Sequence, residues 1–183
     1  MNNIDRFLTN FQESQSNILF ITKHKISFSY GSFWKNALCL ANKWSDGGLK
    51  KGNIVVLNLD NDISMPCAIL ACAIGGFAAC PIVDKKMLTG VVAELNPSLI
   101  IDKEIDLDNH IYMGEGDSYY FSHEKNDYFL INFTAGSTGE PKIMCHGLEQ
   151  IICSAYSFSK QSSFDKNTVL YHVLPMAYMA GIL

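Results

Sequence analysis

The residues best suited to chemistry form one short segment that follows a run of apolar residues. In order, they are Thr134, Ala135, Gly136, Ser137, Thr138, Gly139, Glu140, Pro141 and Lys142. The glycines let the backbone turn with positive φ and approach a ligand closely. Successive N–H groups in such turns form a concave anion site, and the lysine adds one cation. Hydroxyl donors, one positive charge and little steric bulk predict a loop that binds a polyphosphate.

Two better-known phosphate loops do not fit this segment. A Walker loop needs G-x-x-x-x-G-K-[ST], whereas Pro141 stands at the second glycine position and Ile143 follows the lysine. Neither this segment nor Gly75-Gly76 has the G-x-G-x-x-G spacing of a dinucleotide loop. On composition alone, a flexible surface turn stays an alternative.

The segment must be positioned by the elements around it, and hydrophobic periodicity predicts these. Expected strands cover 18–22, 26–30, 54–59, 77–83, 99–101, 128–133 and 168–173, and expected helices cover 4–11, 34–44, 63–74, 86–95 and 148–159. Strands that alternate with helices imply parallel pairing, so we expect an α/β fold with a layered, mostly parallel sheet and flanking helices. In such sheets, ligands bind at the carboxyl ends of the strands, where the segment would lie.

Composition excludes several classes of function. The net charge is −4 and no stretch concentrates lysine and arginine, so nucleic-acid binding has no electrostatic support. Glycines and a proline interrupt the longest apolar stretch, so no membrane span is expected. The N-terminus has no basic region followed by an apolar run, so no secretion signal is expected. Six cysteines lie in apolar segments without a C-x-x-C pair. They predict buried thiols in a reducing cytoplasm, with neither a metal site nor disulfides.

The string T-x-G-S-T-G-x-P-K in Thr134–Lys142 resembles the signature of the adenylate-forming (AMP-binding) superfamily, T-[SG]-G-[ST]-T-G-x-P-K-G. This family includes acyl-CoA synthetases, peptide-synthetase adenylation domains and firefly-type luciferases. Co-linear segments resemble further family blocks: Phe28–Tyr30 with the helix after it, Gly47–Val55, Ala68–Pro81 and Leu174–Gly181.

The resemblance implies activation of a carboxylic acid with Mg²⁺-ATP to an acyl-adenylate, followed by transfer to a thiol of CoA or of phosphopantetheine on a carrier protein. Thr134–Gly139 and Lys142 would bind the phosphates, and Lys142 would also be catalytic. Tyr178, Met179, Ala180 and Gly181 would line the acid pocket, and none of these residues would ligate a metal.

Three residues depart from the family pattern. Ile143 replaces the usual glycine after the lysine, where it suits an outgoing strand. His146 stands four residues past the lysine instead of six, and we interpret it as a histidine at the start of a helix. Tyr178 takes the place of a common histidine, so it is either a pocket residue or a core aromatic.

The resemblance covers only the N-terminal part of the family's large domain. We therefore expect residues 1–183 to be the N-terminal portion of an AMP-binding domain and to be inactive alone. The rest of that domain, with the adenine segment and the ribose-binding aspartate, and the lid domain with its catalytic lysine would lie further along. A non-catalytic binding or scaffold module with the same fold is the alternative, and an unrelated flavodoxin-like module is a third interpretation.

Overall fold

A computed structural model describes residues 2–82, 84–105, 107, 120–124, 126–134, 142–165 and 167–182. Its helices are α1 (Asn3–Glu13), α2 (Tyr30–Asp46), α3 (Ser64–Gly75), η1 (Lys85–Met87, a 3₁₀ turn), α4 (Leu88–Leu95), α5 (Leu148–Gln161) and α6 (Met179–Ile182). Its strands are β1 (Ile18–Ile21), β2 (Ser27–Ser29), β3 (Ile54–Leu57), β4 (Ala78–Pro81), β5 (Leu99–Ile101), β6 (Leu130–Thr134) and β7 (Lys142–His146). None of the described helices is long and apolar enough to cross a membrane.

Within the described part of the chain, the central sheet has five strands in the order β5-β3-β4-β6-β7. β5, β3, β4 and β6 run parallel, and only β7 at the edge is antiparallel. Strand β3 is nearly all β-branched and its last three residues are buried, as expected for a strand covered on both faces. The prediction of a layered, mostly parallel α/β sheet is therefore confirmed.

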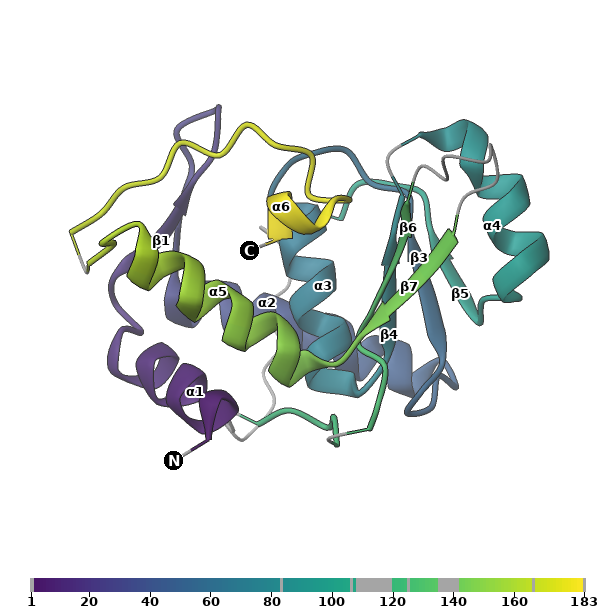
Figure 1. The fold of residues 1–183 in the computed structure, drawn as a ribbon, viewed down its shortest axis with the longest axis horizontal. Helices are drawn as coiled ribbons and strands as arrows, with labels where there is room; N and C mark the ends of the chain where they lie inside the picture. Colours follow the sequence, from purple (N-terminus) through teal and green to yellow (C-terminus); the bar gives the residue numbers. More distant parts are fainter. Residues whose placement is uncertain are drawn as a thin grey trace.

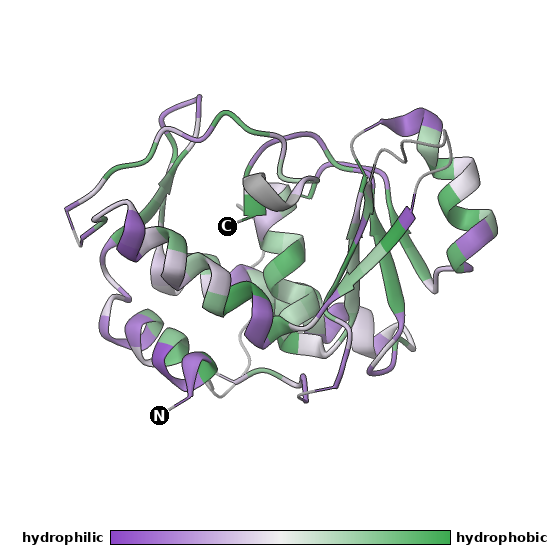
Figure 2. Ribbon diagram, in the orientation of Figure 1, coloured by the Kyte–Doolittle hydropathy of each residue, from purple (hydrophilic) through white to green (hydrophobic). Residues whose placement is uncertain are grey.

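Helices cover both faces of this sheet. Figure 1 shows α4 on one side and α1, α2, α3 and α5 on the other, with the β1–β2 hairpin lying apart from the main sheet. The inner strands are coloured as hydrophobic in Figure 2, whereas α1 carries both kinds of residue. The helix-covered faces explain why the strands carry unbroken apolar runs and no alternation.

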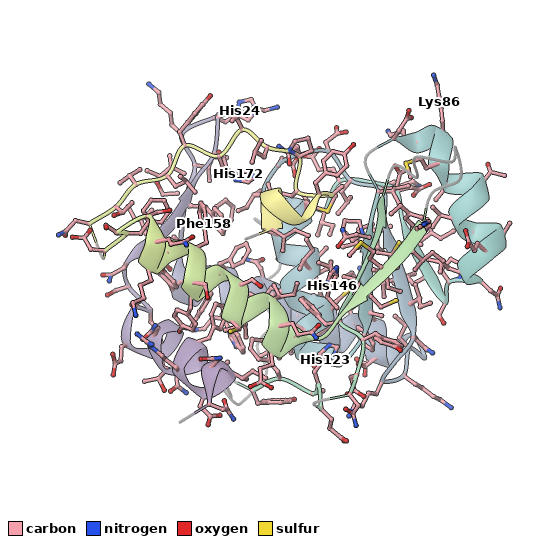
Figure 3. The ribbon with its side chains drawn as sticks, viewed as in Figure 1. His24, Lys86, His123, His146, Phe158 and His172 are labelled. Atoms are coloured by element: carbon pink, nitrogen blue, oxygen red, sulfur yellow. The ribbon has the colours of Figure 1, made fainter. Side chains whose placement is uncertain are left out.

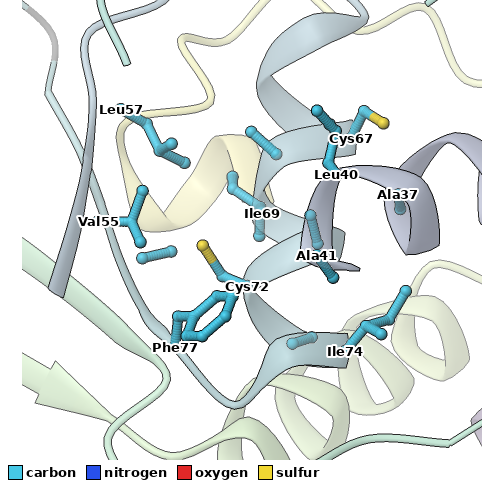
Figure 4. Packing of buried hydrophobic residues seen from close by; sticks show 14 of the residues in the cluster. Ala37, Leu40, Ala41, Val55, Leu57, Cys67, Ile69, Cys72, Ile74 and Phe77 are labelled. Atoms are coloured by element: carbon cyan, nitrogen blue, oxygen red, sulfur yellow. The ribbon is translucent and has the colours of Figure 1, made fainter. Parts of the chain in front are cut away.

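The larger core lies between α2, α3 and β3 (Figure 4). Helix α3 is apolar almost all round because it is enclosed by α2 on one side and the sheet on the other. Phe77, which follows α3, is 1% exposed and lies 6.3 Å from Trp44 between ring centroids. A Cβ on Gly75 would overlap the Phe77 ring, and Gly76 closes the helix with a φ of 74°. Gly75 therefore allows the end of α3 to pack closely against Phe77, just before β4.

Three expectations about local structure were wrong. The segment 168–173 was expected to be a strand because of its β-branched and aromatic residues, but it belongs to no helix or strand. Its side chains are highly exposed, with Val169 at 90% and Tyr171 at 88%. His146 is the last residue of β7, paired with Leu130, and not the first residue of a helix. Of the six thiols, Cys145 and Cys153 are exposed and not buried.

At the amino edge of the sheet, a partly buried histidine lies beside an exposed ion pair. The ring of His123 packs edge-on against Phe129, and its Nε2 lies 3.3 Å from the carbonyl oxygen of Cys72. The nearest charges are Asp127 and Lys51, which bond to each other at 3.0 Å. Burial lowers the pKa of the imidazole below its ordinary value of 6.5, and the carbonyl and Asp127 offset only part of that effect.

This histidine makes stability depend on pH. Because its pKa is lower in the folded state, the unfolded chain binds more protons below about pH 6.5. The free energy of unfolding that comes from neutral His123 is therefore fully present above that pH, and it is lost as the pH falls. We expect His123→Gln to show a smaller loss of unfolding midpoint between about pH 7 and pH 5 than the unsubstituted protein. Thermal unfolding at several pH values measures this, with His24→Gln in an exposed turn as the control. Equal losses in all three proteins would contradict the prediction.

Candidate functional site

The predicted phosphate loop begins and ends at one edge of the sheet. Thr134 is the last residue of β6, Lys142 is the first residue of β7, and the two are paired across the antiparallel ladder. Both lie at the edge where the parallel strands have their carboxyl ends. Ala135, Gly136, Ser137, Thr138 and Gly139 lie outside the described residues, as do Glu140 and Pro141.

Strand β6 carries a polar residue just before this loop. Asn132 is 7% exposed, between Ile131 and Phe133 in an otherwise apolar strand. Its Nδ2 donates to the backbone carbonyl of Ala177 at 3.0 Å. This contact joins the strand that leads into the loop to the segment predicted to line the acid pocket.

A second asparagine, which lies in a turn, binds the residues just before Ala177. Asn61, in the turn after β3, donates from Nδ2 to the carbonyl of Leu174 at 3.1 Å. Its Oδ1 accepts from the N–H of Met176 at 2.9 Å. The side chain therefore pairs with two backbone groups of an irregular segment, as a neighbouring strand would. We call Asn61 and Asn132 the asparagine clamp.

The clamp leads directly into the predicted pocket residues. The N–H of Tyr178 donates to the carbonyl of Pro175 at 3.0 Å, and the N–H of Gly181 donates to the carbonyl of Tyr178 at 2.9 Å. Gly181 is buried, and a Cβ there would overlap the carbonyl oxygen of Pro175. Only glycine therefore fits this turn.

The four predicted pocket residues differ in what the structure describes of them. The Tyr178 side chain is 51% exposed, so it is not a core aromatic in this structure. Met179 and Ala180 belong to α6, and their side chains are outside the description. Figure 1 shows α6 above α3, at the edge of the sheet where β6 and β4 end.

Two cavities help to locate the charges around the sheet. One of about 150 Å³ lies beyond β3 and β5, with carboxylates from Asp60, Asp62, Asp102 and Glu104 against the single ammonium of Lys85. This excess of negative charge would repel a polyphosphate, since like charges at close range are unfavourable. Among the described residues, no group of His, Cys, Asp and Glu could hold a metal ion.

The other cavity, of about 760 Å³, lies at the amino edge of the sheet. Its lining includes Asn3 of α1, Tyr128 before β6 and Gly147 before α5. His123 and His146 also lie toward this end (Figure 3). None of the predicted site residues lines it. The carboxyl edge therefore stays the better candidate, since it gathers both ends of the predicted loop and the clamp.

The buried thiols do not provide a nucleophile. Burial raises the pKa of Cys80 to about 12 and that of Cys67 and Cys72 further still. A thiol reacts through its thiolate, which these environments disfavour.

The sequence prediction missed both asparagines of the clamp. One signal was available for Asn132, because an amide in an apolar strand needs a partner and is worth explaining. Asn61 gave no such signal, since an asparagine in a polar turn is ordinary.

The chain belongs to the AMP-binding enzyme family, whose model matches residues 8–183. A comparison with curated proteins found no match.

Solved structures of several adenylate-forming enzymes share its fold. ATP-bound MatB from Rhodopseudomonas palustris has a TM-score of 0.83 and 15% identity, over 100% of this chain and 42% of that chain. McyG A-PCP complexed with phenylalanyl-adenylate has a TM-score of 0.77 and 19% identity, over 98% of this chain and 33% of that chain. The third structure is the o-succinylbenzoate CoA synthetase of Bacillus subtilis in complex with its acyl-adenylate intermediate. It has a TM-score of 0.78 and 16% identity, over 96% of this chain and 51% of that chain. The chain thus spans about two fifths of the length of MatB.

Proposed function

We propose that the protein activates a carboxylic acid with ATP. A carboxylate oxygen of the acid attacks the α-phosphorus, the bond to the bridging oxygen breaks, and pyrophosphate leaves. The resulting acyl-adenylate then passes its acyl group to the thiol of CoA or of a carrier-protein phosphopantetheine, with release of AMP. The observation that supports this most strongly is the family match across residues 8–183, which includes the loop T-A-G-S-T-G-E-P-K.

The residues present suit a triphosphate better than any other group. Lys142 opens β7 opposite Thr134, so the lysine and the threonine flank a loop rich in hydroxyls and backbone donors. We assign the loop residues, with Lys142, to the phosphates that leave as pyrophosphate. In adenylyl transfer the protein mainly positions groups and stabilises charge, which fixed donors and one ammonium can do. Bound Mg²⁺ would neutralise part of the phosphate charge, and the described residues supply no ligand set of their own.

We assign the acid to the turn that the clamp holds. Ala177 is bonded to the strand that leads into the phosphate loop. It is followed directly by the predicted pocket residues Tyr178, Met179, Ala180 and Gly181. These residues are too few to name the acid.

We infer that these residues form the N-terminal portion of a larger adenylation domain. Family resemblance places the adenine-binding, ribose-binding and lysine-bearing parts beyond them, and MatB is more than twice as long. The 183 residues alone would then exchange no pyrophosphate with ATP and would bind ATP weakly. Tight ATP binding to residues 1–183 in isothermal titration would contradict this inference.

The test is an ATP–pyrophosphate exchange screen of the full-length protein with fatty, aryl and amino acids. We expect one class of acid to give exchange well above the reaction without acid. Product analysis with CoA, and separately with a phosphopantetheinylated carrier protein, then identifies the acceptor. A folded full-length protein that gives no exchange with any acid would support a non-catalytic scaffold and refute the proposed activity.

A further inference from the structure

The buried asparagine of the clamp has an unusual bonding pattern. Asn132 donates to Ala177, but its Oδ1 is buried and has no hydrogen-bond partner among the described residues. An acceptor buried without a donor costs free energy, which offsets the stabilisation from the bond to Ala177. Leu130, two residues earlier on the same face of β6, is apolar and fully buried. Local stability therefore does not explain the amide.

The position of Asn132 explains it better. Alternate residues of a strand face opposite sides of the sheet, so Asn132 faces the same side as Leu130, toward the core of α3 and α5. Ala177, the residue before the predicted pocket residues, meets Asn132 on that side and is also buried. The 3.0 Å bond fixes the backbone of Ala177, one residue before Tyr178. Two residues further along β6, Thr134 begins the phosphate loop.

We propose that Asn132 is a positioning residue that sets the distance and orientation between the acid-binding turn and the phosphate loop. Asn61 holds the other end of the same segment through Leu174 and Met176. The clamp thus holds Leu174–Ala177 from β6 and from the turn after β3, and α6 follows this segment in the chain. This inference rests on the proposed function, because it takes Tyr178–Gly181 as the turn that meets the acid.

Removing the side-chain amide of Asn132 should weaken use of the acid and leave ATP binding nearly unchanged. In the full-length protein, we expect Asn132→Leu to raise the KM for the acid about tenfold, a loss of one positioning contact. The KM for ATP should change by less than about twofold, because the hairpin ends stay paired. The unfolding midpoint should stay close to the original, because losing the unpaired Oδ1 offsets leaving the Ala177 carbonyl without a donor.

Asn36 provides a matched control. It is 8% exposed, against 7% for Asn132, and its Nδ2 also donates to a backbone carbonyl (Ser32, 2.9 Å). Its Oδ1 is also buried without a partner among the described residues. It lies in α2, away from the clamp. Asn36→Leu should therefore leave the KM for the acid unchanged. Asn61→Ala is a second test that avoids the core, because Asn61 is exposed. It should raise the KM for the acid in the same way as Asn132→Leu.

Hydrogen exchange gives a readout that does not need activity. The amides of Tyr178 and Gly181 are bonded within the turn, so loosening Ala177 should speed their exchange in Asn132→Leu and not in Asn36→Leu. Unchanged exchange at these amides would overturn the proposal, and so would a parallel rise of both KM values. If the original protein activates no acid, the proposed function fails. The amide exchange then still decides whether Asn132 holds the turn.

Discussion

Replacing Lys142 by alanine should lower ATP–pyrophosphate exchange by the full-length protein by about one to two decades. Lys142 supplies one ammonium at the end of the predicted phosphate loop, where β7 begins opposite Thr134. A charge-assisted hydrogen bond contributes roughly 1.5–3 kcal/mol, which corresponds to that loss in rate. Exchange measured over a range of ATP concentrations separates the effect on KM from the effect on turnover.

The control is Lys160→Ala. Lys160 is also exposed, but it lies in the last turn of α5, far along that helix from the sheet. Its removal changes the net charge by the same amount and should leave exchange nearly unchanged. Full exchange by the Lys142→Ala protein would refute the assignment of this loop to the phosphates. An equal loss in both variants would point to a general charge effect.

Replacing Phe77 by alanine should destabilise the fold by about 3–5 kcal/mol. Phe77 is 1% exposed and lies in the larger core, where its ring contacts Trp44 and the backbone of Gly75. The lost stability has two parts: the free energy of burying an aromatic ring, and the cost of the cavity that remains between α3 and the sheet. Calorimetry or circular dichroism should show the unfolding midpoint lower by roughly 10 °C.

Tyr171→Ala is the matched control for Phe77, because it also removes an aromatic ring. Tyr171 is 88% exposed, in the extended segment before α6. Its removal should change the midpoint by no more than about 1–2 °C, since surface substitutions rarely exceed 0.5 kcal/mol. A Phe77 variant that melts as late as the Tyr171 variant would contradict the assignment of that ring to the core.

Most of the central sheet could be predicted because its signals are local. A β-branched run such as Ile54–Leu57 needs cover on both faces, and alternation with helices implies parallel neighbours. The predicted loop also followed from local order, since its residue types and their spacing are contained within nine positions.

The errors arose where neighbours distant in sequence decide the outcome. Residues 168–173 have a strand composition, but β-propensity mainly reflects packing against neighbours, and this segment pairs with no described strand. The antiparallel β7 depends on how the chain reverses after Thr134, which composition does not specify. Both exposed thiols lie in locally apolar sequence, and only the tertiary arrangement decides which side faces solvent. The clamp joins Asn132 to a residue 45 positions away, so no window of sequence contains both partners.

The bonds of Asn61 also bear on the order in which the molecule assembles. They join residues 113 and 115 positions apart, so a very long loop must close before either bond can form. That closure loses chain entropy unless β3, β4 and β6 have already brought the ends together. The turn that would meet the acid should therefore order last, after the sheet has formed. It should also be among the first parts of the described chain to open.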